Sequence, residues 1–421
     1  MVEKIHPRHF ADATLVAGRD DVRILQVSQT YYPYLAEGGR PAKVLAIAKG
    51  MAQRGHEVTV LTADLGSALR EENLPQQREF PWGWRAEAQG VETIYLRTRL
   101  RHRAVTWNPG VSRFCTERLR TFDVVHIYGL YDLLGPRVAS YCRRQGVPYV
   151  VEPMGMFRPI ARSLRLKRLY HALLGGSLLR GARYLIATAE QERQELIEGD
   201  LPKAKIIVRR NGVELPERFP SLGSFRRQWK IPAAARLVLF LGRLVSKKSP
   251  ELMLEAFAGW RSGTPDPGGC FLVVAGPTED DSYRQKLETL SADLGLNAVV
   301  LFTGPLYDDA KWAAYRDAHL FVLPSQNENF GNTAAEAVAC GTPVLVTDRC
   351  GIAPLVDQRA GLVVPHDLQA MQAGLTRLLE NDALHQQLQQ GCAEVARALD
   401  WEQPLACMEQ LYAELAQEGQ P

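Results

Sequence analysis

Short runs of consecutive apolar residues alternate along the chain with segments that have the periodicity of an amphipathic helix. Residues 22–27 form the first run, residues 44–52 follow with apolar side chains on one helical face, and residues 55–63 contain the second run. A strand without polar alternation is typical of a parallel sheet that is covered on both faces. The pattern predicts an α/β, Rossmann-like domain that begins with a strand, a glycine-containing loop, a helix and a second strand.

The alternation continues and restarts once, after a proline-containing segment at residues 214–220. Further strands are predicted at 123–129, 148–151, 184–187, 205–208, 237–241, 270–275, 298–302, 320–323, 343–347 and 361–364. Residues 65–118 interleave Pro, Trp and Arg, and predict only strands and loops of unknown order. We expect two Rossmann-like domains, residues 1–212 and 213–400, that face each other across a cleft at the carboxyl ends of their strands. Residues 401–421 are expected to form a helix that returns to the first domain.

Residues 320–343 predict a buried strand, a polar loop and a helix with Asn332 as its N-cap and Gly341 as its stop signal. Glu328 and Glu336 bracket the start of this helix. Because helical side chains lean toward the N-terminus, both carboxylates are expected to face one small volume beside unpaired backbone amides. A ligand for this place should offer hydroxyls to the two acids and an anionic group to the amides. A sugar nucleotide has both. The alternative is two acids at favourable positions of the helix dipole.

Basic and glycine residues follow two of the predicted strands. Arg243 and Lys248 come after the strand at 237–241, where they can neutralise a diphosphate; a surface ion pair is the alternative for Arg243. Gly38 and Gly39 end the loop after the first strand, where they either form a tight turn or let the backbone approach a ligand. No G-x-G-x-x-G is present there, which disfavours a dinucleotide cofactor and an oxidoreductase.

Two other stretches leave alternatives open. His126 and Tyr128 point to one face of the strand at 123–129, either as structural side chains or as catalytic ones. Residues 157–184 carry only basic charges, interleaved with leucines. These basic residues are Arg158, Arg162, Arg165, Lys167, Arg168, Arg180 and Arg183. They form either a surface for an anionic membrane or a phosphorylated acceptor, or a solvated basic face.

Composition narrows the class of protein. The chain has 421 residues, of which 46% are hydrophobic and 23% charged, as in a soluble globular protein. A net charge of +3 implies no general affinity for nucleic acid. The seven scattered cysteines, without a C-x-x-C pair, favour reduced thiols in the cytoplasm over a zinc site. No apolar run reaches the ~18 residues of a membrane span, and no secretory segment is recognisable.

The run E-N-F-G-N-T-A-A-E, from Glu328 to Glu336, resembles the E-x7-E signature of the family 4 retaining glycosyltransferases, which have the GT-B fold. GGRPAKVLAIAKGMAQRGHEVTVLT, DVVHIYG, ATAEQER, RNGV, GRLVSKK, VAGP and GTPVLVTDRCG agree with it, in the right order over residues 22–415. The resemblance implies transfer of a hexosyl group from a nucleoside diphosphate sugar to a glycan or lipid-linked acceptor, as in polysaccharide biosynthesis. It implies no cofactor and no metal.

The resemblance also assigns residues. The donor-binding set is Gly38, Gly39, Arg243, Lys248, Asn329, Phe330, Gly331, Asn332 and Glu336, and the catalytic set is Glu328, His126 and Tyr128. Arg243 and Lys248 would hold the diphosphate, Glu336 the ribose and Glu328 the donor sugar. Tyr128 stands where the family commonly has a second histidine, and Met154 stands in a frequent His-Gly pair. A sugar-nucleotide epimerase of the same fold and a silent sugar-nucleotide binding protein are the alternatives.

Overall fold

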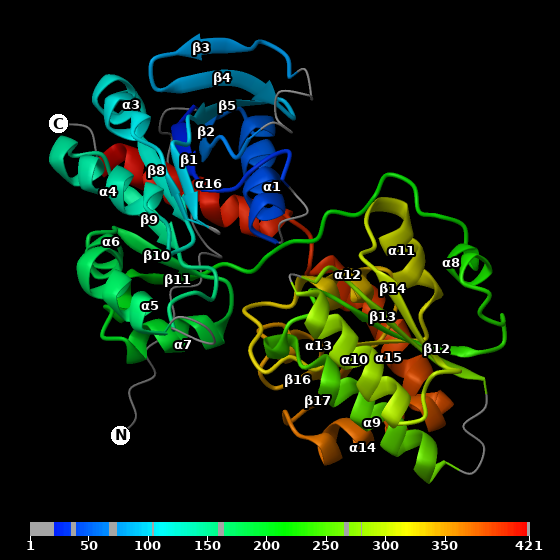
Figure 1. Cartoon of the computed structure of the whole chain (residues 1–421). Coiled ribbons are helices and arrows are strands. Elements are labelled where there is room, and N and C mark those ends of the chain that lie inside the picture. Colours follow the sequence, from blue (N-terminus) through cyan, green and yellow to red (C-terminus); the bar gives the residue numbers. More distant parts are fainter. Residues whose placement is uncertain are drawn as a thin grey trace, which may run out of the picture. The chain divides into compact units, whose positions relative to one another are not determined.

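The computed structural model of the chain describes residues 21–34, 39–66, 74–102, 105–158, 164–264, 269–278 and 280–418 (Figure 1). These residues form two compact units. The first comprises the described parts of Met1–Ala187, Arg193–Arg210 and Trp401–Pro421, and the second comprises Thr188–Glu192 and the described parts of Asn211–Asp400. No helix among the described residues is long and apolar enough to cross a bilayer.

The first unit is built on a nine-stranded sheet with the order β11-β10-β9-β8-β1-β2-β5-β4-β3. Its parallel strands are β1 (Arg23–Val27), β2 (Glu57–Ala63), β5 (Val91–Leu96), β8 (Val124–Tyr128), β9 (Tyr149–Glu152), β10 (Tyr184–Ala187) and β11 (Ile206–Val208). β4 (Gly83–Ala88) and β3 (Arg78–Phe80) add an antiparallel edge. β6 (Leu100–His102) and β7 (Val105–Trp107) form a separate hairpin.

Helices of the first unit are α1 (Gly39–Gln53), α3 (Gly110–Arg118), α4 (Leu134–Gln145), α5 (Leu164–Tyr170), α6 (Gly176–Arg180) and α16 (Glu402–Glu418). Between α5 and α6 lies a π-helical turn, His171–Gly175. Short 3-10 turns are η2 (Leu119–Thr121) and η4 (Lys203–Lys205), and α7 (Glu190–Glu198) spans residues of both units. α16, red in Figure 1, packs against α1 and β8.

The second unit contains a six-stranded parallel sheet with the order β14-β13-β12-β15-β16-β17. The strands are β12 (Arg236–Leu241), β13 (Cys270–Ala275), β14 (Val300–Gly304), β15 (Leu320–Leu323), β16 (Val344–Thr347) and β17 (Gly361–Val364). Numbered from β12, this is the doubly wound order 3-2-1-4-5-6, whose switch point lies between β12 and β15.

The helices of the second unit are α8 (Ser224–Gln228), α9 (Pro250–Gly263), α10 (Asp281–Asp293), α11 (Asp308–Asp317), α12 (Asn332–Ala339), α13 (Ala353–Val356), α14 (Leu368–Glu380) and α15 (Asp382–Arg397). A 3-10 turn, η5 (Ser246–Lys248), follows β12.

The apolar runs are continuous because both faces of each sheet are covered. In β12, Leu237 and Leu239 belong to one buried cluster, and Val238 and Phe240 belong to another on the opposite face. Since successive strand side chains point to opposite faces, residues 237–241 of β12 are all apolar. The predicted α/β fold with two Rossmann-like sheets is therefore confirmed.

One local interpretation needs correction. Residues 110–118 form helix α3, which was not predicted, because the helix is short and its N-cap Pro109 makes no capping hydrogen bond. Two acidic pairs, Asp280-Asp281 and Asp308-Asp309, lie at the starts of helices. Asp280 accepts a hydrogen bond from the Ser282 amide as N-cap of α10, and Asp308 begins α11.

Candidate functional site

The switch point of the second sheet brings together the segments that follow β12 and β15. The amide of Gln326 donates to the carbonyl of Lys247 at 2.9 Å, which joins the two loops. Beside them, a side chain at Gly276 would meet the Gly242 carbonyl oxygen at 1.8 Å, so this approach of two strand ends requires glycine. Arg243 and Lys248 thus emerge where an open α/β sheet binds its ligand.

Lys248 and Glu328 form an ion pair at this place, and their side chains are 14% and 15% exposed. Backbone bonds hold the acid in position: the Glu328 amide donates to Arg349, and its carbonyl accepts from Gly351. Burial lowers the pKa of Lys248 to about 7, and Lys247 acts in the same direction. The contact with Glu328 favours the charged amine and acts against this shift. An incoming anion would also stabilise the charged form of the Lys248 amine.

Helix α12 begins at Asn332, and its N-cap is Gly331 rather than the predicted Asn332. Gly331 has φ +105°, a conformation that residues with a side chain rarely adopt. The Asn332 side chain instead accepts a hydrogen bond from the Asn211 amide group at 2.8 Å. No side chain caps α12, so its first backbone amides suit an anionic group.

Two more residues of the predicted donor set fix this loop. Phe330 is 2% exposed and belongs to the core below α12. The Asn329 side chain donates to the Thr188 hydroxyl. Neither contact involves a charge, and both act on the path of the backbone between Glu328 and α12.

Glu336 lies on α12 but faces α11. Its Oε1 accepts a hydrogen bond from Lys311 Nζ at 2.9 Å, and its Oε2 accepts one from the Tyr315 hydroxyl at 2.8 Å. Burial, and then the charge of Glu336, raise the pKa of Tyr315 well above its usual value. The structure thus gives the two acids different cations, Lys248 for Glu328 and Lys311 for Glu336, rather than one shared partner.

Lys311 and Tyr315 were not found from the sequence. They are four residues apart and therefore share one face of α11, a spacing that is visible in the sequence. However, their relation to Glu336 depends on the packing of α11 beside α12, which no local pattern indicates.

The predicted residues of the first unit have a different setting. Gly38 lies outside the described residues, and Gly39 is the exposed first residue of α1. His126 and Tyr128 are 0% exposed, and their rings stack at 3.9 Å. His126 Nδ1 lies 2.7 Å from the Tyr412 hydroxyl of α16. Burial lowers the pKa of His126 to about 3, so the ring is neutral at physiological pH.

These rings adjoin a buried charge cluster centred on Glu152. Lys43 Nζ donates to Glu152 Oε1 at 2.5 Å, Arg209 pairs with the other oxygen, and His126 Nε2 is 3.6 Å away. Burial opposes ionisation of Glu152, but Arg209 and Lys43 outweigh it and lower the pKa to about 2. Because His126 and Tyr128 lie inside this cluster, the geometry favours the structural interpretation of both over the catalytic one.

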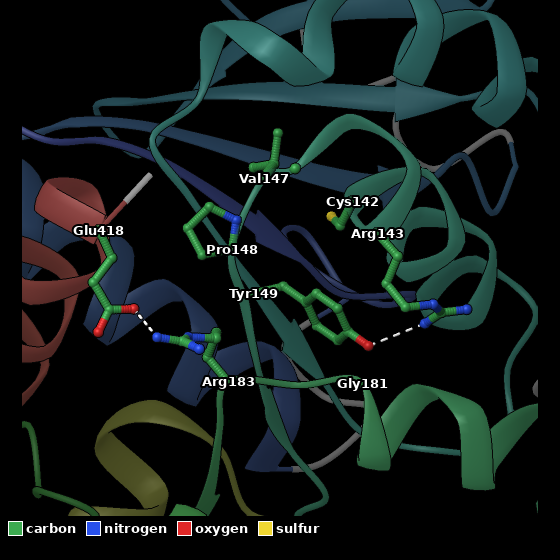
Figure 2. Close-up of a pocket in the computed structure, with 9 residues that line it drawn as sticks. Cys142, Arg143, Val147, Pro148, Tyr149, Gly181, Arg183 and Glu418 are labelled. Atoms are coloured by element: carbon green, nitrogen blue, oxygen red, sulfur yellow. Dashed lines mark hydrogen bonds and ion pairs between the residues drawn. The ribbon is translucent and has the colours of Figure 1, made fainter. Parts of the chain in front are cut away.

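A hollow in the first unit contains none of the predicted donor-binding or catalytic residues (Figure 2). It has a volume of about 550 Å³ and lies beside Val147, Pro148 and Tyr149, at the amino end of β9. The ion pair of Arg183 with Glu418 of α16 borders it. Ligands of open α/β sheets bind at the carboxyl ends, so this hollow is on the opposite edge.

The described residues were also compared with the arrangement of side chains that a metal ion needs. Among them, no group of three His, Cys, Asp or Glu side chains is arranged to hold an ion. The cationic groups that follow the strands at the switch point are the side chains of Arg243 and Lys248.

Two units, each built on a Rossmann-like sheet with a switch point, form the architecture of the GT-B fold. The fold is similar to that of sucrose-phosphate synthase from Thermosynechococcus elongatus, with a TM-score of 0.68, 21% identity and coverage of 93% of this chain and 99% of the other. It is also similar to Anabaena Alr3699/HepE in complex with UDP and glucose, with a TM-score of 0.71, 17% identity and coverage of 93% and 100%.

Sequence comparisons then give the family. Residues 223–395 match the model described as glycosyl transferases group 1, and residues 38–212 match the glycosyl transferase 4-like domain. A D-inositol 3-phosphate glycosyltransferase of Thermomonospora curvata is 30% identical over 397 residues, 87% of this chain and 88% of the relative. The same enzyme of a Nocardioides species is 29% identical, over 87% of this chain and 82% of the relative. The chain belongs to the group 1 glycosyl transferases.

The family establishes what the resemblance implied. The chain is a retaining glycosyltransferase that takes its sugar from a nucleoside diphosphate sugar. The predictions of the family, of the GT-B fold and of this activity are confirmed. The roles of individual residues remain predictions.

Proposed function

We propose that the donor diphosphate binds at the switch point of the second sheet, against Arg243, Lys248 and the first amides of α12, and that its hexosyl group passes to a glycan or lipid-linked acceptor. The observation that carries this proposal is the partly buried pair of Lys248 with Glu328. Charge develops on the leaving diphosphate as the glycosidic bond breaks. Cations that are already in place stabilise this charge without reorganisation.

The two acids receive different roles. Glu328 is held by backbone bonds beside the diphosphate-binding cation, where its carboxylate can act on the donor sugar as positive charge develops at the anomeric carbon. Glu336 is oriented by Lys311 and Tyr315 and keeps acceptor sites for ribose hydroxyls, because a carboxylate has about four lone-pair sites. Asn329 and Phe330 hold the connecting loop, and Gly39 stands at the start of α1 in the other unit.

Substitution of the cations tests the site. Because charge-assisted hydrogen bonds contribute about 1.5–3 kcal/mol, Arg243→Ala and Lys248→Ala should each weaken donor binding by roughly tenfold to a hundredfold. Calorimetry with the nucleoside diphosphate that most stabilises the chain measures this effect. Lys286→Ala, an exposed cation on α10, is the matched control and should bind normally. Unchanged affinity in both site variants would remove the proposed site.

An epimerase would consume donor without an acceptor, whereas the transferase releases nucleotide only when acceptor is present.

We also propose peripheral contact with an anionic membrane through the segment from Arg158 to Arg183, at the cytoplasmic face. Leu166, Leu169 and Leu173 are 67%, 53% and 67% exposed, although leucines of a helix normally face the core. Their spacing places them on one outward face of α5 and the turn after it. Arg165 and Arg168 are exposed beside them.

Both the exposed leucines and the exposed arginines favour contact with an anionic membrane surface. Burying one leucine side chain contributes about 1.5–3 kcal/mol, and each basic residue near an anionic surface contributes about 1 kcal/mol. Of the other basic residues, Arg158 and Arg183 are paired with acids and Arg162 lies outside the described residues. Vesicle flotation tests the contact. Leu166→Ser/Leu169→Ser should lower binding to anionic vesicles, the exposed Leu222→Ser of the second unit should not, and equal binding to neutral vesicles would contradict the proposal.

A further inference from the structure

The first sheet has a switch point of its own, where β1 lies between β2 and β8. Open α/β sheets bind ligands beyond the carboxyl ends of the strands at such a point. Three segments contribute side chains there: the first turn of α1, residues 129–132 after β8, and the inward face of α5 with the π-helical turn. A single π-helical turn is itself frequent at functional sites. The proposed donor site uses none of these side chains.

Arg40 is held at this point by the backbone and by a buried acid. Gly129 has φ +84°, and a side chain there would come within 2.6 Å of the Arg40 guanidinium carbon. Arg40 Nη1 lies 3.9 Å from Asp132 Oδ2, and Nη2 is 3.2 Å from Met156 Sδ. The other oxygen of Asp132 accepts the Gly135 amide at 2.8 Å, so this acid also fixes the start of α4. The guanidinium therefore has a defined position.

The segment from α5 supplies two further nitrogen groups around Tyr131. His171 Nε2 lies 3.0 Å from the Tyr131 hydroxyl, and Lys167 Nζ lies 5.4 Å from the centre of the Tyr131 ring. The Tyr170 ring is 5.2 Å from that of Tyr131. Burial raises the pKa of Tyr170, Asp132 adds to this rise and Arg40 opposes it, so this ring links the two halves of the cluster.

We propose that Arg40, Lys167 and His171 bind a phosphate group of the acceptor, with Tyr131 and Tyr170 as the wall of this subsite. A guanidinium, an ammonium and an imidazole are hydrogen-bond donors that suit phosphate oxygens. The acid beside Arg40 is Asp132, and one of its oxygens already accepts a hydrogen bond from the Gly135 amide. The subsite rests on the proposed function and deepens it, because it gives the acceptor an anionic group.

The two faces of one helix support this assignment. Lys167, Tyr170 and His171 follow the i, i+3, i+4 spacing and are partly buried, whereas Leu166 and Leu169 point outward. A lipid-linked phosphate would therefore meet the subsite from the same helix that contacts the bilayer. A soluble phosphorylated acceptor presents the same chemistry, and the experiment separates acceptor binding from binding of bilayer headgroups.

Calorimetry of the full chain with glycerol 3-phosphate tests the subsite, with glycerol as the uncharged match. The chain carries Arg243→Ala and Lys248→Ala, so that the proposed donor site does not bind the probe. We expect glycerol 3-phosphate to bind and glycerol not to bind. Added Arg40→Gln or Lys167→Gln should weaken it about tenfold, equivalent to about 1.4 kcal/mol. Arg40→Lys should restore part of the affinity. Arg113→Gln, an exposed arginine on α3, should change nothing.

Several outcomes overturn the subsite. They are no binding of glycerol 3-phosphate, unchanged affinity in Arg40→Gln, or an equal loss in Arg113→Gln. In the otherwise unchanged chain, Arg40→Gln should keep its donor affinity; a loss there would assign Arg40 to the donor and overturn the subsite while leaving the donor site standing. Arg40→Gln should also keep its binding to anionic vesicles, because a parallel loss would assign the cluster to bilayer headgroups. If the proposed donor site is wrong instead, Arg243→Ala and Lys248→Ala will each bind the donor normally.

Discussion

Two acid–base clusters of this chain use the same chemistry in different surroundings. Glu152 in the first unit is 0% exposed and lies between Lys43 and Arg209, whereas Glu328 in the second unit is 15% exposed and pairs with Lys248 at a switch point. A charge pair that no ligand can reach contributes to the folded state alone. A pair that keeps some exposure where strands end can exchange its partner for a ligand. Burial, rather than residue type, separates an acid that only its own chain can reach from one that a ligand can reach.

The largest effect should follow from breaking the buried cluster. Glu152→Ala leaves Lys43 and Arg209 buried without their acid, which typically costs about 3–5 kcal/mol of the free energy of unfolding. Urea denaturation measures this loss, and hydrogen exchange in β8 and β9 assigns it to the first unit. Asp382→Ala removes one partner of the exposed pair with Arg236 and should leave stability unchanged. A loss as small as that of Asp382→Ala would end the structural interpretation.

The same cluster predicts the pH dependence of stability. The pKa of Glu152 is lowered to about 2 from its usual value of 4.5. A lowered folded-state pKa contributes stability that is present above the unfolded value and is lost as pH falls through the folded one. The first unit should therefore lose stability between about pH 4.5 and pH 2. In Glu152→Gln this component should be missing, and an identical acid profile in both proteins would contradict the cluster.

The next largest effect concerns turnover. Glu328→Gln keeps the shape of the side chain but removes the charge that would act on the donor sugar, so turnover should fall by about 10²–10³-fold. Nucleotide affinity should change little, because Lys248 remains. Nucleotide release in the presence of acceptor measures turnover, and calorimetry measures affinity. Normal turnover would leave this loop with a donor-binding role only.

Much of this comparison could be predicted from the sequence. Strands buried on both faces leave continuous apolar runs, and the switch-point rule then places Arg243, Lys248 and Glu328 at one sheet edge. The burial of His126 could not be predicted, because Tyr412, which covers it, is 286 residues away in sequence. Likewise, Gly331 replaces Asn332 as N-cap because the backbone must adopt φ +105° there, a tertiary demand that outweighs capping preference.

A smaller effect should appear in the pH dependence of donor binding. With the pKa of Lys248 at about 7, the amine is charged below this value and loses its proton above it. A diphosphate binds the charged form, so affinity should be constant below about pH 7 and fall by up to about tenfold per pH unit above it. Lys248→Arg should remove this slope, because a guanidinium stays charged. A flat profile in the unchanged chain would contradict the assigned role.

The smallest effect should come from Glu336. Lys311 and Tyr315 hold its carboxylate, and ribose hydroxyls that bond to it would do so almost equally in the ground and transition states. Glu336→Gln should therefore raise the KM for donor by about tenfold or less, with kcat nearly unchanged. Tyr315→Phe should move KM in the same direction but less, because Lys311 still orients the acid. Initial rates at varied donor concentration measure both constants. A fall in kcat with constant KM would place Glu336 at the reacting centre and erase its contrast with Glu328.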